Sequence, residues 1–318
     1  LEFFYLIKLN YLYSSFKLSE VCELRSFLLE QSINLPKNLL QKSDIFCLTL
    51  ENNFAEAKLL NSLLLESETV KDENFQKLFN YMILNEQEDN YFDPLSNIKS
   101  KELIFLYSAM LRINELPLHE EFINTDPLNL SIPVILSNST KMSTRIKAAN
   151  KAFYDETLSI DSLAALYQSV DFNSKQFNDS KQTILALSGN NELIMAFYYQ
   201  LANIQIFPND RLKIILEYWK FAKELGIENI AYAITKNIIE TIEPNSENTK
   251  FALEIALAHI SNNNFIDAKK WISFIEISET NIEDINYAKF LITLNETDEI
   301  NTIINYLKNN YEKLNSLE

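Results

Sequence analysis

The sequence predicts an all-α fold, an α-solenoid of stacked antiparallel helix hairpins with no sheet. Three observations predict it: two glycines in 318 residues, apolar residues at helical spacing along most of the chain, and one turn sequence that occurs twice. Tight β-hairpins and phosphate-binding loops need glycine, so its scarcity argues against β-rich folds, P-loops and the usual dinucleotide-binding folds. Sustained polar–apolar alternation, the pattern of a strand, is also missing from the sequence.

Helical periodicity is clearest in the second half of the chain. Leu212, Ile215 and Trp219 have the spacing i, i+3 and i+7 of a helix face that packs on a core. Gly226 follows this stripe and Gly189 follows an earlier one. Both glycines are expected just beyond a helix end in the left-handed conformation.

A repeated turn sequence predicts helix hairpins in both halves of the chain. Segment 52–58, Asn-Asn-Phe-Ala-Glu-Ala-Lys, matches segment 263–269, Asn-Asn-Phe-Ile-Asp-Ala-Lys. In each copy an apolar helical stretch precedes the Asn pair and another follows the Lys. We expect the Asn residues to end one helix, the Phe to return to the core, and the small Ala to let two helices approach closely.

Polar residues and prolines divide the chain near its middle. Asn85–Asn97 is polar and ends soon after Asp93-Pro94, and the next stretch of chain is interrupted by Pro117, Pro127 and Pro133. Prolines at this density favour short helices and turns. We therefore expect an N-terminal helical-hairpin block, an irregular connector with short helices, and a C-terminal helical-repeat block, at 1–84, 85–138 and 139–318.

Charge limits the class of partner. The formal net charge is −16 and the isoelectric point is near 4.7. Nucleic acids and anionic membrane surfaces are bound by clustered Lys and Arg, so neither partner is expected. No apolar stretch reaches the ~18 residues of a transmembrane helix. A protein or peptide is the expected partner, and oligomeric state stays open.

No catalytic, cofactor or metal site is expected. His119 and His259 are isolated in sequence, whereas a catalytic histidine needs an oriented partner. Cys22 and Cys47 form no CxxC pair, and we favour two small buried side chains over a disulfide, which stays open. The acidic run 86–89 lacks the spacing of a calcium loop and is expected to be solvated.

Adjacent aromatic residues supply the one candidate binding surface. Tyr198-Tyr199 and Tyr218-Trp219 each place two rings about 100° apart on a helix, so one ring of each pair can face outward. Tyr and Trp are favoured anchors at interfaces. All four are candidate partner-binding residues on a concave groove; the alternative is that large rings fill a glycine-poor core.

Two resemblances to known proteins arise from these motifs. Residues 255–275, with Phe265, Ala268 and Trp271 after the turn, resemble a tetratricopeptide hairpin, and the two turn copies lie about six 34-residue repeats apart. Segment 145–276, through Arg-Ile-Lys-Ala-Ala at its start and Leu-Ala-Ala-Leu-Tyr at 163–167, is similar to uncharacterised α-proteobacterial helical-repeat proteins. That resemblance implies a bacterial export-associated or envelope protein, with the periplasm or envelope favoured over the cytoplasm.

The expected function is a non-catalytic scaffold that binds a protein or peptide on the concave surface of a helical repeat. One alternative is a structural subunit of a larger, envelope-associated assembly. Its docking edge would be the first helix, which is apolar on more than one face. Because the chain starts at Leu1 without a Met, we expect a fragment or a processed form. The apolar first helix, which lacks the polar outer face of a terminal cap, leads us to expect further helices before it. The other alternative is an enzyme on a helical scaffold, such as a glycan-cleaving one.

Overall fold

The computed structural model describes residues 1–31, 33, 35–67, 72–84, 101–275, 282–296 and 304. Every regular element in these ranges is a helix, so no strand or sheet occurs among them and the predicted all-α class is confirmed. The chain divides into two compact units, Leu1–Ser159 and Ile160–Glu318. Within each unit, helices that follow one another in the chain pack in pairs, which is compatible with a helical-repeat fold.

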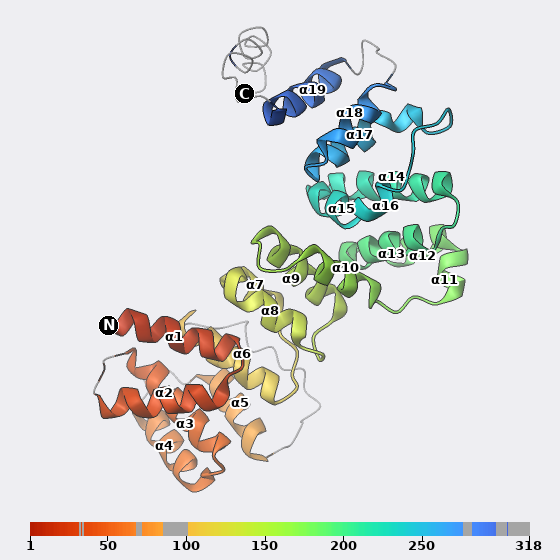
Figure 1. Ribbon diagram of the computed structural model, residues 1–318. Coiled ribbons are helices and arrows are strands. Elements are labelled where there is room, and N and C mark those ends of the chain that lie inside the picture. Colours follow the sequence, from red (N-terminus) through yellow and green to blue (C-terminus); the bar gives the residue numbers. More distant parts are fainter. Residues whose placement is uncertain are drawn as a thin grey trace. The chain divides into compact units, whose positions relative to one another are not determined.

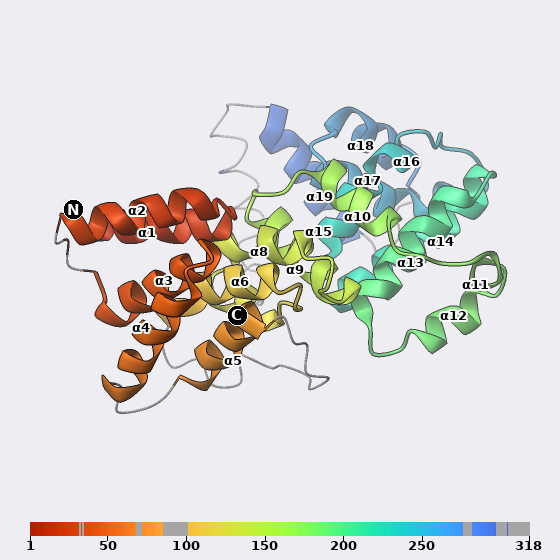
Figure 2. The same cartoon turned by 90° about the horizontal axis from the view of Figure 1, so that it is seen from below.

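The first unit packs helices that follow one another in the chain and also brings distant helices together. Helix α1 lies beside α2 and, much later in the sequence, beside α6 and α8 (Figures 1 and 2). These contacts bring helices that are far apart in the sequence into one core, to which α1 contributes its buried face. The helices of this unit are α1 (Glu2–Ser14), α2 (Leu18–Glu30), α3 (Lys37–Leu50), α4 (Phe54–Ser67), α5 (Glu73–Leu84), η1 (Lys101–Leu103), α6 (Ile104–Ile113), α7 (Glu120–Thr125), α8 (Pro127–Leu136) and α9 (Met142–Tyr154).

The proline-containing helix α8 and its neighbour α7 belong to the first unit. Pro127 is the first residue of α8, where its missing N–H costs nothing, and Asp126 caps that helix by accepting from the Asn129 N–H at 3.1 Å. Both helices pack on α9. The blocks 1–84, 85–138 and 139–318 remain a prediction about domains, whereas the compact unit extends to Ser159.

An ion pair joins α3, α5 and α6 inside the first unit. Lys42, whose side chain is fully buried, donates from Nζ to Asp72 Oδ2 at 2.7 Å and lies 5.4 Å from the Phe75 ring centroid. Asp72 also accepts from the Tyr107 hydroxyl and from the Phe75 N–H. Burial alone raises the pKa of the Asp72 carboxyl, but the hydrogen bonds from Lys42 and Tyr107 outweigh it and leave that pKa below its usual value.

A disulfide joins α2 to α3. Cys22 and Cys47 are bonded, with Cα atoms 5.5 Å apart, and both side chains are buried. The preferred prediction of two unbonded buried thiols was therefore wrong. Periodicity places the two cysteines on inward faces, but it carries no information about how α2 is aligned along α3, which decides whether the sulfur atoms meet.

Several helices of the second unit pack against more than one neighbour. Helix α13 packs against α10 and α14, and α14 packs in turn against α15 (Figures 1 and 2). Near the C-terminal end, α17 forms a hairpin with α18 and contacts α19. The helices are α10 (Ile160–Gln168), α11 (Ser174–Asn178), α12 (Ser180–Ala186), α13 (Asn191–Ile204), α14 (Pro208–Glu224), α15 (Glu228–Ile234), α16 (Lys236–Ile239), η2 (Thr249–Phe251), α17 (Ala252–Ser261), α18 (Phe265–Ile272) and α19 (Ile282–Glu296).

The repeated turn has the same structure in both units. Asn52 and Asn263 adopt left-handed φ angles of 62° and 57° just beyond the ends of α3 and α17. The next residue's N–H returns to a carbonyl five residues earlier, at 2.8 Å in both copies, which is the Schellman pattern. Ala57 and Ala268 are fully buried, and the flanking helices pack as hairpins, so the hairpins predicted at these segments are confirmed.

Left-handed residues also follow other helices, at both glycines and at three residues that are neither Asn nor Gly. Gly189 and Gly226 have φ angles of 87° and 70°, which confirms their predicted left-handed conformation. Phe16, Glu115 and Glu156 adopt φ angles of 59°, 54° and 56° at the ends of α1, α6 and α9. A side chain in this conformation costs about 1–2 kcal/mol, which glycine avoids.

We therefore expect Glu156→Gly to stabilise the first unit by about 1 kcal/mol, because Glu156 is exposed and its backbone conformation suits glycine. The free energy of unfolding from urea titrations measures this effect. Glu23→Gly is the control, since Glu23 is exposed inside α2 and glycine there is expected to destabilise the fold by about 1 kcal/mol. Equal destabilisation by both variants would contradict the assignment of the turn.

Candidate functional site

The aromatic residues predicted to bind a partner lie mainly in the core of the second unit. Tyr198, Tyr218 and Trp219 are 8%, 0% and 4% exposed, whereas Tyr199 is half-buried. Tyr198 stacks on Tyr218 with ring centroids 6.0 Å apart, and Trp219 Nε1 donates to Thr235 Oγ1 at 3.0 Å.

Packing on two sides explains this burial. Helix α13 lies between α10 and α14, and α14 contacts both α13 and α15, so neighbours about 100° apart on either helix both turn inward. Tyr199 follows the same rule in part, because its ring packs edge-on against Tyr167 with centroids 6.1 Å apart. These rings contribute to the core, and a binding role for any of the four residues remains a prediction.

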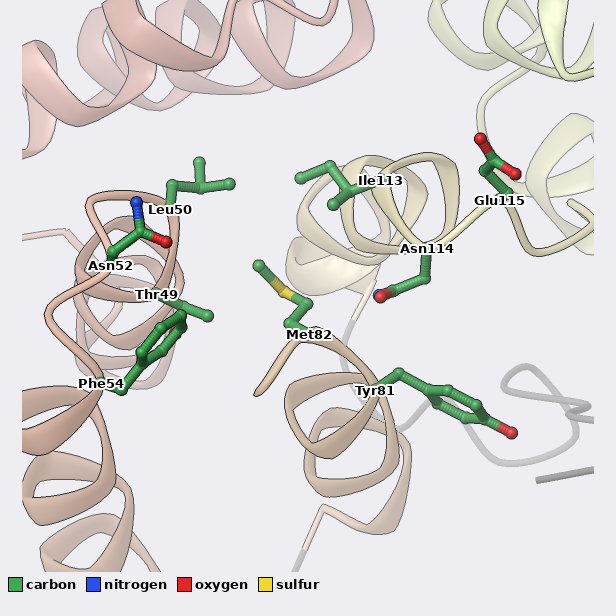
Figure 3. Close-up of a pocket in the computed structure, with 9 residues that line it drawn as sticks. All are labelled: Thr49, Leu50, Asn52, Phe54, Tyr81, Met82, Ile113, Asn114 and Glu115. Carbon is green, nitrogen blue, oxygen red and sulfur yellow. The ribbon is translucent and has the colours of Figure 1, made fainter. Parts of the chain in front are cut away.

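The candidate site lies instead at the ends of three helices in the first unit. A hollow of about 520 Å³ opens where α3, α5 and α6 end and where α4 begins (Figure 3). Its lining comes from segments that are far apart in sequence. The residues are Thr49, Leu50, Asn52, Phe54, Tyr81, Met82, Ile113, Asn114 and Glu115.

The Schellman turns place polar groups beside an apolar floor. Asn52 and Glu115, the two left-handed turn residues, lie at the α3 and α6 sides of the hollow. Figure 3 shows the Met82 side chain pointing between Leu50 and Ile113, whereas the Tyr81 ring points away from them. The hollow is therefore apolar where Met82 lies and polar along its edges.

A second hollow of about 490 Å³ adjoins the first. Leu50 lines both, so the two hollows lie on either side of this residue at the C-terminal end of α3. Cys22 of the disulfide also lines the second hollow, which the bond holds between α2 and α3. We call the two hollows together the α3 groove; its further lining residues are Leu18, Ser19, Glu23, Ser26 and Glu51.

The electrostatics of the first hollow are negative. Glu115 is the one charged side chain among its described lining residues. A helix C-terminus carries a partial negative charge, and neither α3 nor α5 has a basic residue in its last turn. The basic residue at the end of α6, Arg112, lies against the Phe16 ring, 4.2 Å from its centroid, and donates to the Ser14 carbonyl at 3.0 Å.

The two histidines occupy different surroundings. His259 in α17 is 1% exposed, and neither ring nitrogen hydrogen-bonds to any residue in the described part of the chain. Burial lowers its pKa below 6.5, and the nearby carboxylates of Asp267 and Glu240 oppose that shift only in part. His119 directly precedes α7 in the first unit and is half-buried.

Comparison with models of known protein families, with curated proteins and with solved structures found no match for this chain. The tetratricopeptide and α-proteobacterial resemblances therefore remain predictions. Among the described residues, no helix is long and apolar enough to cross a membrane. In the same residues, no group of three or more His, Cys, Asp or Glu side chains is arranged to hold a metal ion.

We expect His259 to make the protein less stable in acid. Its pKa is lowered in the folded state, so below the unfolded value of about 6.5 the unfolded chain binds a proton that the folded chain resists. The free energy of unfolding should fall as the pH drops through this region and level off below the folded pKa.

Urea titrations at several pH values between about 7 and 5 measure this slope. The chain has two histidines. His259→Leu should flatten the slope of the unfolding free energy with pH, and His119→Gln is the control that should keep this slope. A slope that is the same in His259→Leu and in the unsubstituted protein would contradict the prediction.

Proposed function

We propose that this chain is a non-catalytic helical-repeat protein that binds a peptide segment of a partner protein in the α3 groove. The observation that carries the proposal is the pair of adjoining hollows of about 520 and 490 Å³ that share Leu50. Each volume lies within the ~300–1,000 Å³ of ligand sites in proteins. Two hollows that share a residue at one helix end suit an extended segment better than a compact small molecule.

The lining of the α3 groove supports a peptide. Leu50, Met82 and Ile113 provide apolar contact, and the flexible thioether of a methionine adapts to side chains of different shape. Asn52 and Asn114 provide amide groups at the edges, where a peptide backbone offers both donors and acceptors. The described lining therefore offers both apolar contact and hydrogen-bonding groups to a peptide.

The repeated turn supports the helical-repeat part of the proposal. Segments 52–58 and 263–269 form the same hairpin turn in two different units, with an alanine at the contact between the paired helices. A chain that reuses one hairpin in this way is organised as a stack of similar units, and such stacks expose long surfaces to partners.

A second candidate, a structural subunit of a larger assembly, is favoured by the outer face of α1. Phe4, Ile7 and Tyr11 follow the spacing i, i+3 and i+7 and are 61%, 51% and 55% exposed. Exposed apolar stripes of this kind mark interaction surfaces. A glycan-cleaving enzyme remains the third alternative and has no comparable observation in its favour.

The disulfide supports an oxidising compartment, in line with the proposed periplasmic or envelope location. Such bonds persist in exported proteins and are rare in the cytosol. Protein exported during expression should show no thiols that react with maleimide, and its reduction should lower the free energy of unfolding by about 3 kcal/mol. The Cys22→Ala, Cys47→Ala double variant is the control, because the reductant should leave its stability unchanged. Free thiols in the exported, unreduced protein would contradict the bond.

Peptides of about ten residues, selected from a random displayed library against the folded chain, test the proposed function. Substituting Leu50→Gln at the junction of the two hollows should weaken the selected peptides at least about tenfold, measured by fluorescence anisotropy, because it removes a central apolar contact. Leu59→Gln is the matched control: Leu59 lies on α4, is 61% exposed and does not line the groove. It should change the affinity by less than about twofold.

Peptides that bind both leucine variants equally would place recognition elsewhere and reject the α3 groove. Light scattering on the same samples separates the second candidate. Association that grows with protein concentration and is lost in Phe4→Glu, in a chain that selects no peptide, would support the structural subunit instead.

A further inference from the structure

We infer that the first hollow of the α3 groove, at the ends of α3, α5 and α6, takes a lysine or arginine side chain of the bound peptide. This inference rests on the proposed function and adds the chemistry of the partner residue. Three observations carry it: the C-terminal ends of three helices at the hollow, the single carboxylate among its described lining residues, and the apolar side chains that line it.

The helix ends provide a negative potential. Helices α3, α5 and α6 have 14, 12 and 10 residues, and each contributes about half a negative charge at its C-terminus. No basic residue lies in the last turn of α3 or α5. Arg112 offsets part of the α6 dipole, and it lies against Phe16 and the Ser14 carbonyl, outside the lining of the hollow. The hollow has no cation among its described lining residues to balance these dipoles.

The edge of the hollow provides acceptors for a cationic head. Glu115 is exposed and supplies a carboxylate. Beside it, Asn114 uses its Nδ2 to donate to the Met110 carbonyl at 2.8 Å, so its amide oxygen remains as an acceptor. Ammonium and guanidinium groups only donate hydrogen bonds, so these oxygens match a lysine or arginine head.

The floor of the hollow provides contact for an aliphatic stem. Leu50, Met82 and Ile113 line it between the polar edges (Figure 3). Lysine and arginine bury their methylene stems against apolar surface while the charged head stays at the wet edge. A glutamate side chain of the peptide would be repelled by Glu115 and by the same helix ends. The net charge of −16 also favours a cationic over an anionic partner residue.

Methionine methyl NMR on the full chain tests the inference. Four methionines occur in the sequence, of which Met82 lines the hollow and Met110 is fully buried as an internal reference. The Met82 signal is assigned with Met82→Leu. The probes are N-acetyl-lysine methylamide, its neutral counterpart N-acetyl-norleucine methylamide, and N-acetyl-glutamate methylamide. The lysine probe should shift the Met82 methyl in a saturable way, at least about threefold more tightly than norleucine, and added salt should weaken it.

Two matched variants locate the charge. Glu115→Gln should weaken the lysine probe about three- to fivefold without changing the norleucine probe. Glu156→Gln is the control, since Glu156 has the same left-handed turn conformation and exposure at the end of α9 but does not line the hollow. It should leave both probes unchanged.

Equal affinity for lysine and norleucine, equal effects of the two glutamine variants, or no Met82 shift with any probe would each overturn the inference. The proposed function is decided separately by the peptide selection. Peptides that depend on Leu50 but show no enrichment in Lys or Arg would keep the α3 groove as the binding site and reject its preference for cations.

Discussion

Ending a helix without glycine is the constraint on which this structure depends. A chain with two glycines in 318 residues places a residue with a side chain in the left-handed region after five of its described helices. Phe16, Asn52, Glu115, Glu156 and Asn263 all do so. Each such turn is strained by about 1–2 kcal/mol for a residue other than Gly or Asn. After the two Asn turns the paired helices approach closely, with Ala57 and Ala268 fully buried.

The same constraint produces the candidate site. A Schellman turn satisfies the last carbonyls of its helix and directs the side chain of the turn residue outward. Where two such turns, after α3 and α6, lie next to the end of α5, they leave a hollow with Asn52 and Glu115 at its edges. A glycine at either position would give the backbone less strain but would remove a polar group from the site. Stability and recognition thus make opposite demands on these two residues.

The fold could be predicted because its sequence signals are local. The candidate site could not, because its residues are far apart in the chain. The hairpin turns at 52–58 and 263–269 and the left-handed glycines are properties of a few consecutive residues, so their structure could be predicted. The hollow combines residues near 50, 82 and 114, and no pattern within one helix indicates that three helix ends meet. The disulfide failed for a related reason, because the alignment of α2 along α3 depends on tertiary packing. The prediction that one ring of each aromatic pair faces outward assumed that a helix has a single buried face. Helices α13 and α14 each have two.

The buried pair of Lys42 and Asp72 limits which substitutions these two positions can accept in evolution. Helix α5, which carries Met82 into the hollow, is tied to α3 through a fully buried ammonium group rather than through apolar contact alone. Loss of either partner breaks the 2.7 Å contact between the Lys42 ammonium group and Asp72, which is expected to cost more than replacing both by apolar residues of similar volume. Related chains that keep this hollow are therefore expected to exchange positions 42 and 72 together or not at all. Such covariation would identify members of this fold even where the turn sequences have diverged.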